Sequence, residues 1–167
     1  MAGQKPLQQT FHKAVRFFEK GKLNKARKCL LDIQRRQPDI AEVLHLLSLI
    51  ALKKDRAREA VGHLEKAVAL APGSGELFGL LGDALKKAGR LDDALAAFEK
   101  ALAVDPAQAG VHYKMGNTLR DLGRNAEAAE HYRRAVAAEP GFADAHFNLG
   151  KVLKGDGRLD DAAQAYR

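Results

Sequence analysis

The stretch GELFGLLGDALKKAGRLDDALAAFEKALAVDPAQ, residues 75–108, decides how this chain folds. Its apolar residues from Phe78 to Leu85 fall at helical spacing, and a second helical run follows the break at Gly89. Pro106 closes the stretch, because proline cannot continue a helix. The pattern predicts two helices joined by a short turn.

The same unit recurs along the chain with a period of 34 residues. Prolines stand at that interval, at Pro38, Pro72, Pro106 and Pro140. The period divides the chain into residues 7–40, 41–74, 75–108 and 109–142 and an incomplete fifth unit, 143–167. A period of this length indicates a solenoid, in which each unit packs against its neighbours.

Small and large residues also recur at fixed positions of the unit. Position 20 is alanine in every unit, and position 8 is small in every unit: Ala14, Ser48, Gly82, Gly116 and Gly150. Position 24 is large in every unit: Leu30, Leu64, Phe98, Tyr132 and Tyr166. We expect the small residues to let the two helices of a unit approach closely, while the large residues fill the space beside them.

The turn within each unit has its own signal. Gly89, Gly123 and Gly157 follow the last periodic residue of a predicted first helix. A left-handed backbone conformation ends many helices, and glycine adopts it at the lowest cost. The second unit has Asp55 at this place, and aspartate also adopts that conformation.

These repeated residues resemble the tetratricopeptide repeat family, whose pattern has a small residue at position 8, alanine at 20, an aromatic at 24 and proline at 32. The resemblance covers about residues 7–167 and implies an all-α fold, a right-handed superhelical solenoid of antiparallel helix pairs. The first unit departs most, since Thr10 and Lys13 replace apolar residues of the pattern. We expect residues 1–6 to form a disordered leader.

Composition and charge indicate the kind of compartment in which the protein resides. The chain has a formal net charge of +7, and its basic character is concentrated in residues 1–40. No apolar run approaches the roughly 18–20 residues that a membrane span requires. Cys29 is the only cysteine, so it has no partner for an internal disulfide, which fits a reducing compartment. With no secretory signal at the start, we expect a cytoplasmic location.

No residue pattern predicts an enzyme. The glycine-rich turn Gly73–Gly75 lacks the lysine and hydroxyl residue of a phosphate loop. His112 and His146 share position 4 of their units, so a metal pair on successive first helices is one interpretation. Two histidines alone make a weak metal site, and packing with one ring nitrogen bonded is the favoured alternative. We therefore expect no catalytic residue, no metal and no cofactor.

The resemblance implies a concave surface that is lined by the first helices, with ligand-facing residues at fixed positions. In the third to fifth units these positions give the predicted groove residues: Lys86, Lys87, Tyr113, Lys114, Asn117, Arg120, Asn148, Lys151 and Lys154. Side-chain amides bond a peptide backbone without requiring a particular sequence, and the cations favour a peptide with acidic side chains. The plainer alternative is an ordinary solvated helix face.

The equivalent positions of the first two units form what we call the apolar patch: Phe11, Val15, Phe18, Leu46, Leu49 and Leu52. Contiguous exposed apolar surface marks contact sites, so the patch predicts docking of an amphipathic helix from another protein or another copy of this chain. The alternative is that a tighter curl at the N-terminus buries these side chains.

Together these features predict a non-catalytic protein–protein interaction module that holds a peptide or helix. A second interpretation is the substrate-recruiting N-terminal arm of a larger enzyme, because residues 43–52 are similar to arrays that precede glycosyltransferase and sulfotransferase domains. The fifth unit stops within its second helix, so we expect a longer protein. The basic first unit lacks an aromatic stacking platform, which disfavours nucleic acid as the partner.

Overall fold

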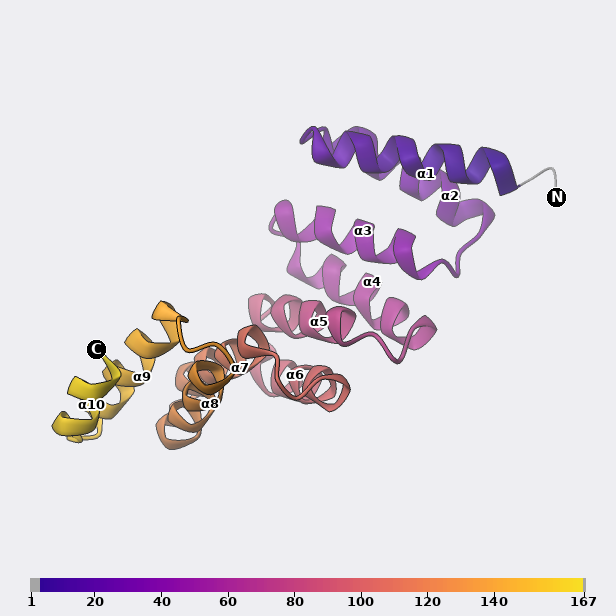
Figure 1. The fold of residues 1–167 in the computed structure, drawn as a ribbon. Coiled ribbons are helices and arrows are strands. Elements are labelled where there is room, and N and C mark those ends of the chain that lie inside the picture. Colours follow the sequence, from indigo (N-terminus) through magenta and orange to yellow (C-terminus); the bar gives the residue numbers. More distant parts are fainter. Residues whose placement is uncertain (1–3, 167) are drawn as a thin grey trace.

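The computed structural model describes residues 4–166, with side chains from residue 7 onward (Figure 1). In this part every regular element is an α-helix, which confirms the all-α prediction. The helices are α1 (Gln4–Glu19), α2 (Leu23–Arg36), α3 (Ala41–Lys53), α4 (Ala57–Leu70), α5 (Gly75–Lys87), α6 (Leu91–Val104), α7 (Ala109–Asp121), α8 (Asn125–Ala138), α9 (Ala143–Gly155) and α10 (Leu159–Ala165). None of these helices has the length and apolar character that crossing a membrane requires.

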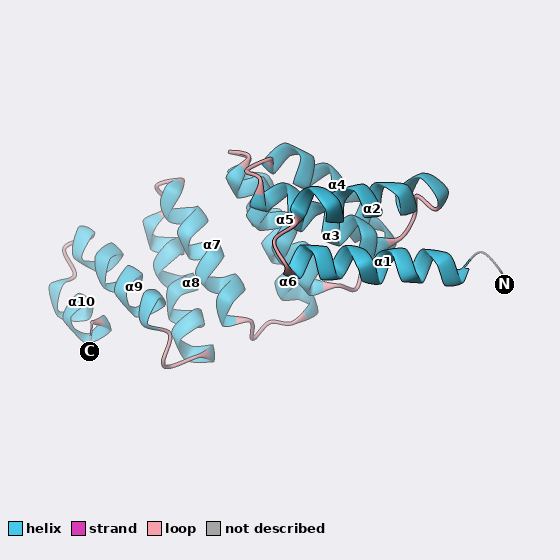
Figure 2. Ribbon diagram, turned by 90° about the horizontal axis from the view of Figure 1, so that it is seen from above, coloured by secondary structure: helices cyan, strands magenta, loops and turns pink. Residues whose placement is uncertain are grey.

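Consecutive helices pair, and the pairs stack in chain order. The pairs run from α1 and α2 at one end to α9 and α10 at the other (Figures 1 and 2). Each pair meets the next one mainly through its second helix and the following first helix. An array whose contacts join neighbouring units is a solenoid, so this part of the prediction is confirmed as well.

The first helices begin in register with the period. Helices α3, α5, α7 and α9 start at residues 41, 75, 109 and 143, the first residues of their units. The leader expected over residues 1–6 overlaps α1, which already begins at Gln4. Residues 1–3 of that expected leader lie outside the described residues.

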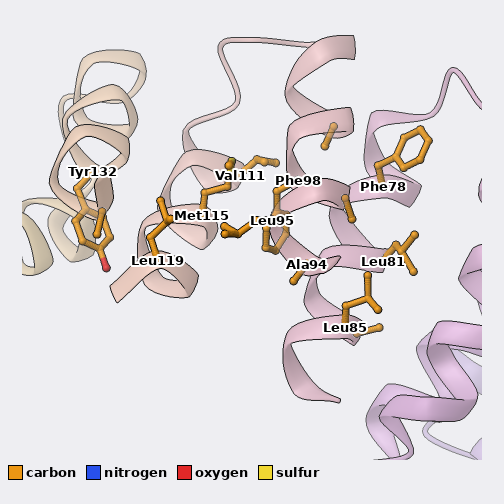
Figure 3. Packing of buried hydrophobic residues seen from close by; sticks show 14 of the residues in the cluster. Phe78, Leu81, Leu85, Ala94, Leu95, Phe98, Val111, Met115, Leu119 and Tyr132 are labelled. Atoms are coloured by element: carbon orange, nitrogen blue, oxygen red, sulfur yellow. The ribbon is translucent and has the colours of Figure 1, made fainter. Parts of the chain in front are cut away.

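The two helices of a unit meet at the small residue of position 8. A Cβ atom on Gly116 would lie 2.6 Å from the ring of Tyr132, and one on Gly82 would lie 2.4 Å from the ring of Phe98. Both rings are fully buried, and Figure 3 shows Phe98 among the side chains of the core. The aromatic ring therefore occupies the space that a side chain at position 8 would need, as the sequence predicts.

The turns inside the units have the predicted left-handed backbone. The φ angle is +80° at Gly89, +76° at Gly123 and +56° at Asp55. At the end of α5 the Gly89 N–H donates to the Lys86 carbonyl over 3.0 Å, and the Arg90 N–H donates to the Leu85 carbonyl over 2.9 Å. These two bonds satisfy carbonyl groups that the end of a helix leaves open.

The apolar core extends along the stack of helix pairs as two clusters of buried residues, and α3 contributes to both. Helix α3 contributes to it on two sides: Val43, Leu47 and Ile50 pack with the first unit, while Leu44 and Ala51 pack with the later units. A helix that is buried on two faces is apolar nearly all round, which explains the run 43–52 in the sequence. Further along, side chains of α5, α6 and α7 point toward one another (Figure 3).

Candidate functional site

Side-chain contacts join the first helices of successive units. His45 of α3 lies 4.0 Å from the carboxylate of Glu76 on α5. Ion pairs then connect α5 with α7, and side-chain amides connect α7 with α9. The predicted groove residues of α5, α7 and α9 therefore share one polar strip, although not all of them touch one another.

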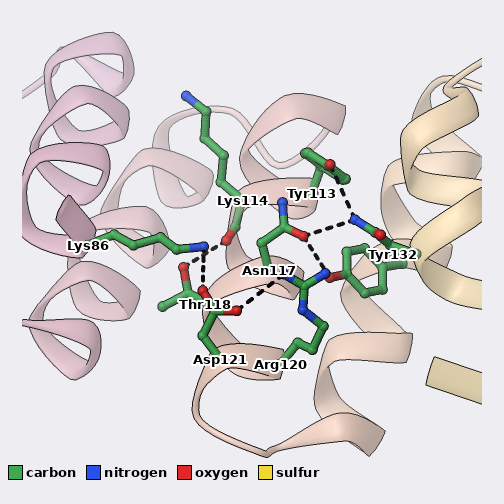
Figure 4. A network of polar contacts seen from close by, with 9 residues as sticks. Lys86, Tyr113, Lys114, Asn117, Thr118, Arg120, Asp121 and Tyr132 are labelled. Carbon is green, nitrogen blue, oxygen red and sulfur yellow. Dashed lines mark hydrogen bonds and ion pairs between the residues drawn. The ribbon is translucent and has the colours of Figure 1, made fainter. Parts of the chain in front are cut away.

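Two ion pairs join α5 and α7, and in each of them a lysine of one helix contacts an aspartate of the other. Lys86 of α5 lies 2.9 Å from Asp121 of α7, and Lys114 of α7 lies 2.7 Å from Asp83 of α5. Arg120 also approaches Asp121, at 3.2 Å (Figure 4). Lys86, Lys114 and Arg120 are thus engaged with carboxylates, so this half of the strip is less cationic than the sequence suggests.

The contacts with Lys86 and Arg120 also lower the pKa of Asp121. Desolvation by burial would raise the pKa of this carboxyl, but the hydrogen bonds from Lys86 and Arg120 outweigh that effect and lower the pKa below its ordinary value. The carboxylate consequently stays ionised and paired at neutral pH.

The remaining cations of the predicted set are more open. Lys87 and Lys154 are exposed and form no ion pair with another described residue. Lys151 is exposed too, and its Nζ atom lies 5.6 Å from the ring centroid of Phe147, which is itself 56% exposed. The unpaired cations of the predicted set are therefore Lys87 on α5 and Lys151 and Lys154 on α9.

Asn117 of α7 and Asn148 of α9, which we call the amide pair, lie at the centre of a hydrogen-bond network. Asn148 Nδ2 donates to Asn117 Oδ1 over 3.0 Å and to the Tyr113 hydroxyl over 3.2 Å. The Tyr132 hydroxyl donates to Asn117 Oδ1 over 2.8 Å (Figure 4). Both lone pairs of the Asn117 carbonyl oxygen are used inside the protein.

The network leaves one donor group and one acceptor free. No side chain bonds Asn117 Nδ2 or Asn148 Oδ1, and every fully buried polar side-chain atom of the described residues has a partner. Each of these two atoms therefore keeps some contact with solvent, although Asn117 is half-buried and Asn148 as a whole is only 8% exposed. Turning one amide alone would oppose two donors or two acceptors, so the amide pair presents one donor and one acceptor to the outside.

Sequence reasoning missed the polar role of Tyr132. The repeat pattern predicts only a packing role for position 24, and the buried ring has that role. Burial also raises the pKa of Tyr132 to about 12, so its hydroxyl keeps its proton and donates at neutral pH. The available signal was a tyrosine at position 24 and an asparagine at position 9 within the same unit.

The apolar patch is partly covered. Each of its six residues is half-buried, and Phe11, Phe18 and Leu46 pack against the core of the first two units. A pocket of about 560 Å³ opens between α1, α2 and α3, and Phe11 and Val43 are among the residues that line it. The side chains thus lie between the exposed and the buried alternatives that the sequence leaves open.

The two histidines at position 4 bond other groups of the protein and not each other. His112 Nε2 bonds the Pro106 carbonyl at 3.1 Å, and its Nδ1 lies 3.1 Å from Nδ1 of His131 on α8. His146 instead contacts two backbone carbonyls, of Pro140 and Ala165. Both nitrogens of each ring thus have a bonding partner, whereas the sequence predicts only one bonded nitrogen. Within residues 4–166 no group of three His, Cys, Asp or Glu side chains could hold a metal ion.

Sequence and structure comparisons agree on one repeat type. A sequence profile described as "Tetratricopeptide repeat" matches residues 12–75 and 113–167, and one described as "TPR repeat" matches residues 82–119. No curated protein matches the chain in sequence.

Solved structures share the fold. A crystal structure of MamA is 25% identical over 92% of this chain and 90% of that chain, with a TM-score of 0.89. MamA from Desulfovibrio magneticus RS-1 is 21% identical over 96% of this chain and 90% of that one, with a TM-score of 0.89. YrrB, described as a TPR protein with an unusual peptide-binding site, is 20% identical over 99% and 89%, with a TM-score of 0.82.

Proposed function

This chain belongs to the tetratricopeptide repeat family, and from that premise we propose that it binds an extended peptide along the first helices of its third to fifth units. Repeats of this family generally serve as non-catalytic interaction modules, so the chain is a protein-interaction module in the broad sense. The peptide ligand, its site and its charge are our proposal.

The observation that carries the proposal is the free donor and acceptor of the amide pair. One residue of an extended chain has its N–H and its C=O on the same side, as in a strand that pairs with a neighbour. Asn117 Nδ2 can donate to that C=O, and Asn148 Oδ1 can accept from that N–H. Such contacts read the backbone and place no demand on the peptide's side chains.

The charge of the strip supports a preference for acidic peptides at its α9 end. Lys151 and Lys154 lie on the same helix as Asn148 and form no ion pair with the described residues. An acidic side chain next to the bound residue would meet these two lysines without displacing an existing partner. At the α5 end Lys87 is unpaired too, but for Lys86 and Lys114 an acidic side chain would have to compete with Asp121 and Asp83.

The likeness to YrrB adds little beyond the fold. At 20% identity it concerns the arrangement of the helices, and the peptide-binding site in its description belongs to that protein. The proposal therefore depends on the contacts of this chain.

The test is a selection of peptides from a displayed random library on the wild-type protein, followed by fluorescence anisotropy with the selected peptides. Asn117→Ala should weaken binding about tenfold, as expected for losing hydrogen bonds in the site. Lys151→Glu/Lys154→Glu should weaken acidic peptides by a similar factor. Lys66→Glu, an exposed change on α4, is the matched control and should leave affinity unchanged.

Circular dichroism confirms that each variant is folded before its affinity is compared. A library that yields no enriched peptide, or peptides that bind Asn117→Ala as tightly as wild type, would overturn the proposal.

A second candidate site is the apolar patch, for which we propose an amphipathic helix of another copy of this chain as the ligand. The pocket beside Phe11 supports it, because an apolar side chain of a docked helix would fill that space. No contact in the described chain favours the alternative of an enzyme's recruiting arm.

A further inference from the structure

We infer that the buried Tyr132 hydroxyl is a positioning group, which holds Asn117 so that the amide pair presents its free donor and acceptor to a peptide. This inference depends on the proposed function, because the orientation of Asn117 has a consequence only if a peptide is bound there. Tyr132 itself does not touch the ligand; it acts through Asn117.

The geometry separates the two roles of this side chain. Tyr132 comes from α8, and its ring fills the space left by Gly116 on α7. The hydroxyl continues past that contact and donates to Asn117 Oδ1 over 2.8 Å. The ring packs against Gly116, and the hydroxyl orients Asn117. Removing the oxygen alone should therefore release Asn117 and leave the packing of the ring unchanged.

The other units show that packing does not require the hydroxyl. Phe98 occupies the same position in the third unit, is equally buried and lies equally close to its glycine, Gly82. Position 9 of that unit is Asp83, which is paired with Lys114 and needs no phenol. Phenylalanine is therefore sufficient to fill the space beside the glycine of position 8. Packing alone does not explain why the fourth unit has a tyrosine at position 24.

The fifth unit gives the complementary case. It has a tyrosine at position 24, Tyr166, but Lys151 at position 9. The Tyr166 ring packs near Phe147, and its hydroxyl bonds no described side chain. Among the described units, only the fourth has a phenol at position 24 that bonds an amide at position 9 of the same unit.

Tyr113 supports the other half of the amide pair. Its hydroxyl accepts from Asn148 Nδ2 over 3.2 Å, and its ring packs 4.9 Å from the ring of Phe142. Each amide is thus held on its inner side by one phenol and by the other amide. Without the Tyr132 hydroxyl, Asn117 keeps a single inner bond and gains freedom to turn.

The first measurement needs no ligand: ¹⁵N relaxation of the side-chain NH₂ groups of Asn117 and Asn148. In wild type we expect an order parameter near the value of about 0.85 that marks rigid groups. In Tyr132→Phe the value for Asn117 should fall below about 0.6, while backbone values stay unchanged. Tyr166→Phe is the matched control, the same change at the same position of the next unit, and should leave Asn117 unchanged.

The second measurement uses the peptides selected on the wild-type protein. Tyr132→Phe should bind them roughly five- to tenfold more weakly, in line with one lost orienting hydrogen bond. Methylating the backbone nitrogen that binds Asn148 should cost wild type and Tyr132→Phe a similar factor, because it removes the bond to Asn148 whereas Tyr132 acts through Asn117. Tyr113→Phe, which is half-buried, provides a second variant that acts on Asn148.

The outcomes separate the two proposals. Unchanged relaxation and unchanged affinity in a folded Tyr132→Phe would overturn the positioning role and leave peptide binding intact. A library that yields no peptide for wild type would overturn the proposed function, and the positioning role would fall with it.

Discussion

At the scale of the residue, Gly116 and Tyr132 share one space between α7 and α8. The ring lies where a Cβ atom on Gly116 would be, and it is completely buried. We call this contact between the position-8 glycine and the position-24 ring the seam. Neither residue can change size without the other, since the close-packed seam has no free volume to absorb an added methyl group. The same relation holds for Gly82 and Phe98, so it is a property of the repeat.

The first prediction concerns that seam. Gly116→Ala should lower the free energy of unfolding by about 1–3 kcal/mol, because the ring of Tyr132 must shift to admit the methyl group. The measurement is urea-induced unfolding. Gly110→Ala on the same helix is the control, since nothing lies within 4 Å of its added Cβ.

Alanine favours a helix more than glycine does, so the control should leave stability unchanged or raise it by up to about 1 kcal/mol. Equal effects of the two substitutions would contradict the seam as the cause.

At the scale of the element, the contact between α7 and α8 includes a pair of imidazoles. His112 Nε2 donates to the Pro106 carbonyl, which leaves its Nδ1 as an acceptor for Nδ1–H of His131. Burial, together with the nearby His112 and Arg134, lowers the pKa of His131 below its ordinary value of 6.5. The folded state therefore favours the neutral ring.

The second prediction is the resulting pH dependence. Because the folded pKa of His131 lies below the unfolded one, its contribution to stability is present above pH 6.5 and is lost as the pH falls through the folded pKa. Unfolding free energy, measured by urea denaturation across this range, should decline on acidification. His131→Ala, which copies Ala97 and Ala165 at the same position, should reduce that decline.

Other groups act on the same ring and set the size of the effect. Glu127 and Glu130 of α8 raise the pKa of His131, and Asp92, Glu99 and Arg124 line the pocket beside it. His63 also has a lowered pKa through burial, so part of the decline should persist in His131→Ala. A decline that the substitution leaves undiminished would contradict the contribution of His131.

At the scale of the whole molecule, charge and apolar surface are distributed unevenly along the stack. The first unit is basic, the middle units pair their charges across first helices, and α9 holds open lysines. The half-buried apolar patch lies at the opposite end, on α1 and α3. The two proposed contact surfaces are therefore distinct and can be altered separately.

The third prediction tests the apolar patch. Phe18→Asp/Leu49→Asp should abolish concentration-dependent association in light scattering, because two carboxylates oppose docking of an apolar helix face. Gln9→Asp/Gln34→Asp adds the same charge outside the patch and should leave association as in wild type. A monodisperse monomer before and after the change, with unchanged peptide binding, would remove the patch as a contact site.

The sequence by itself determined the architecture. The period, the small–large seam and the left-handed turn, including Asp55, could be read from the chain because they arise within one unit or between neighbours. It also supplied the residue types of the candidate site through the family resemblance.

Only the tertiary structure decided what those residues do. Nothing in the repeat pattern predicts that Lys86 and Lys114 are paired, that Tyr132 holds Asn117, or that His112 meets His131. The physical reason is distance. A repeat pattern places each side chain on a helix face, but the exact stacking of one helix on another determines which polar atoms come within about 3 Å and which remain free.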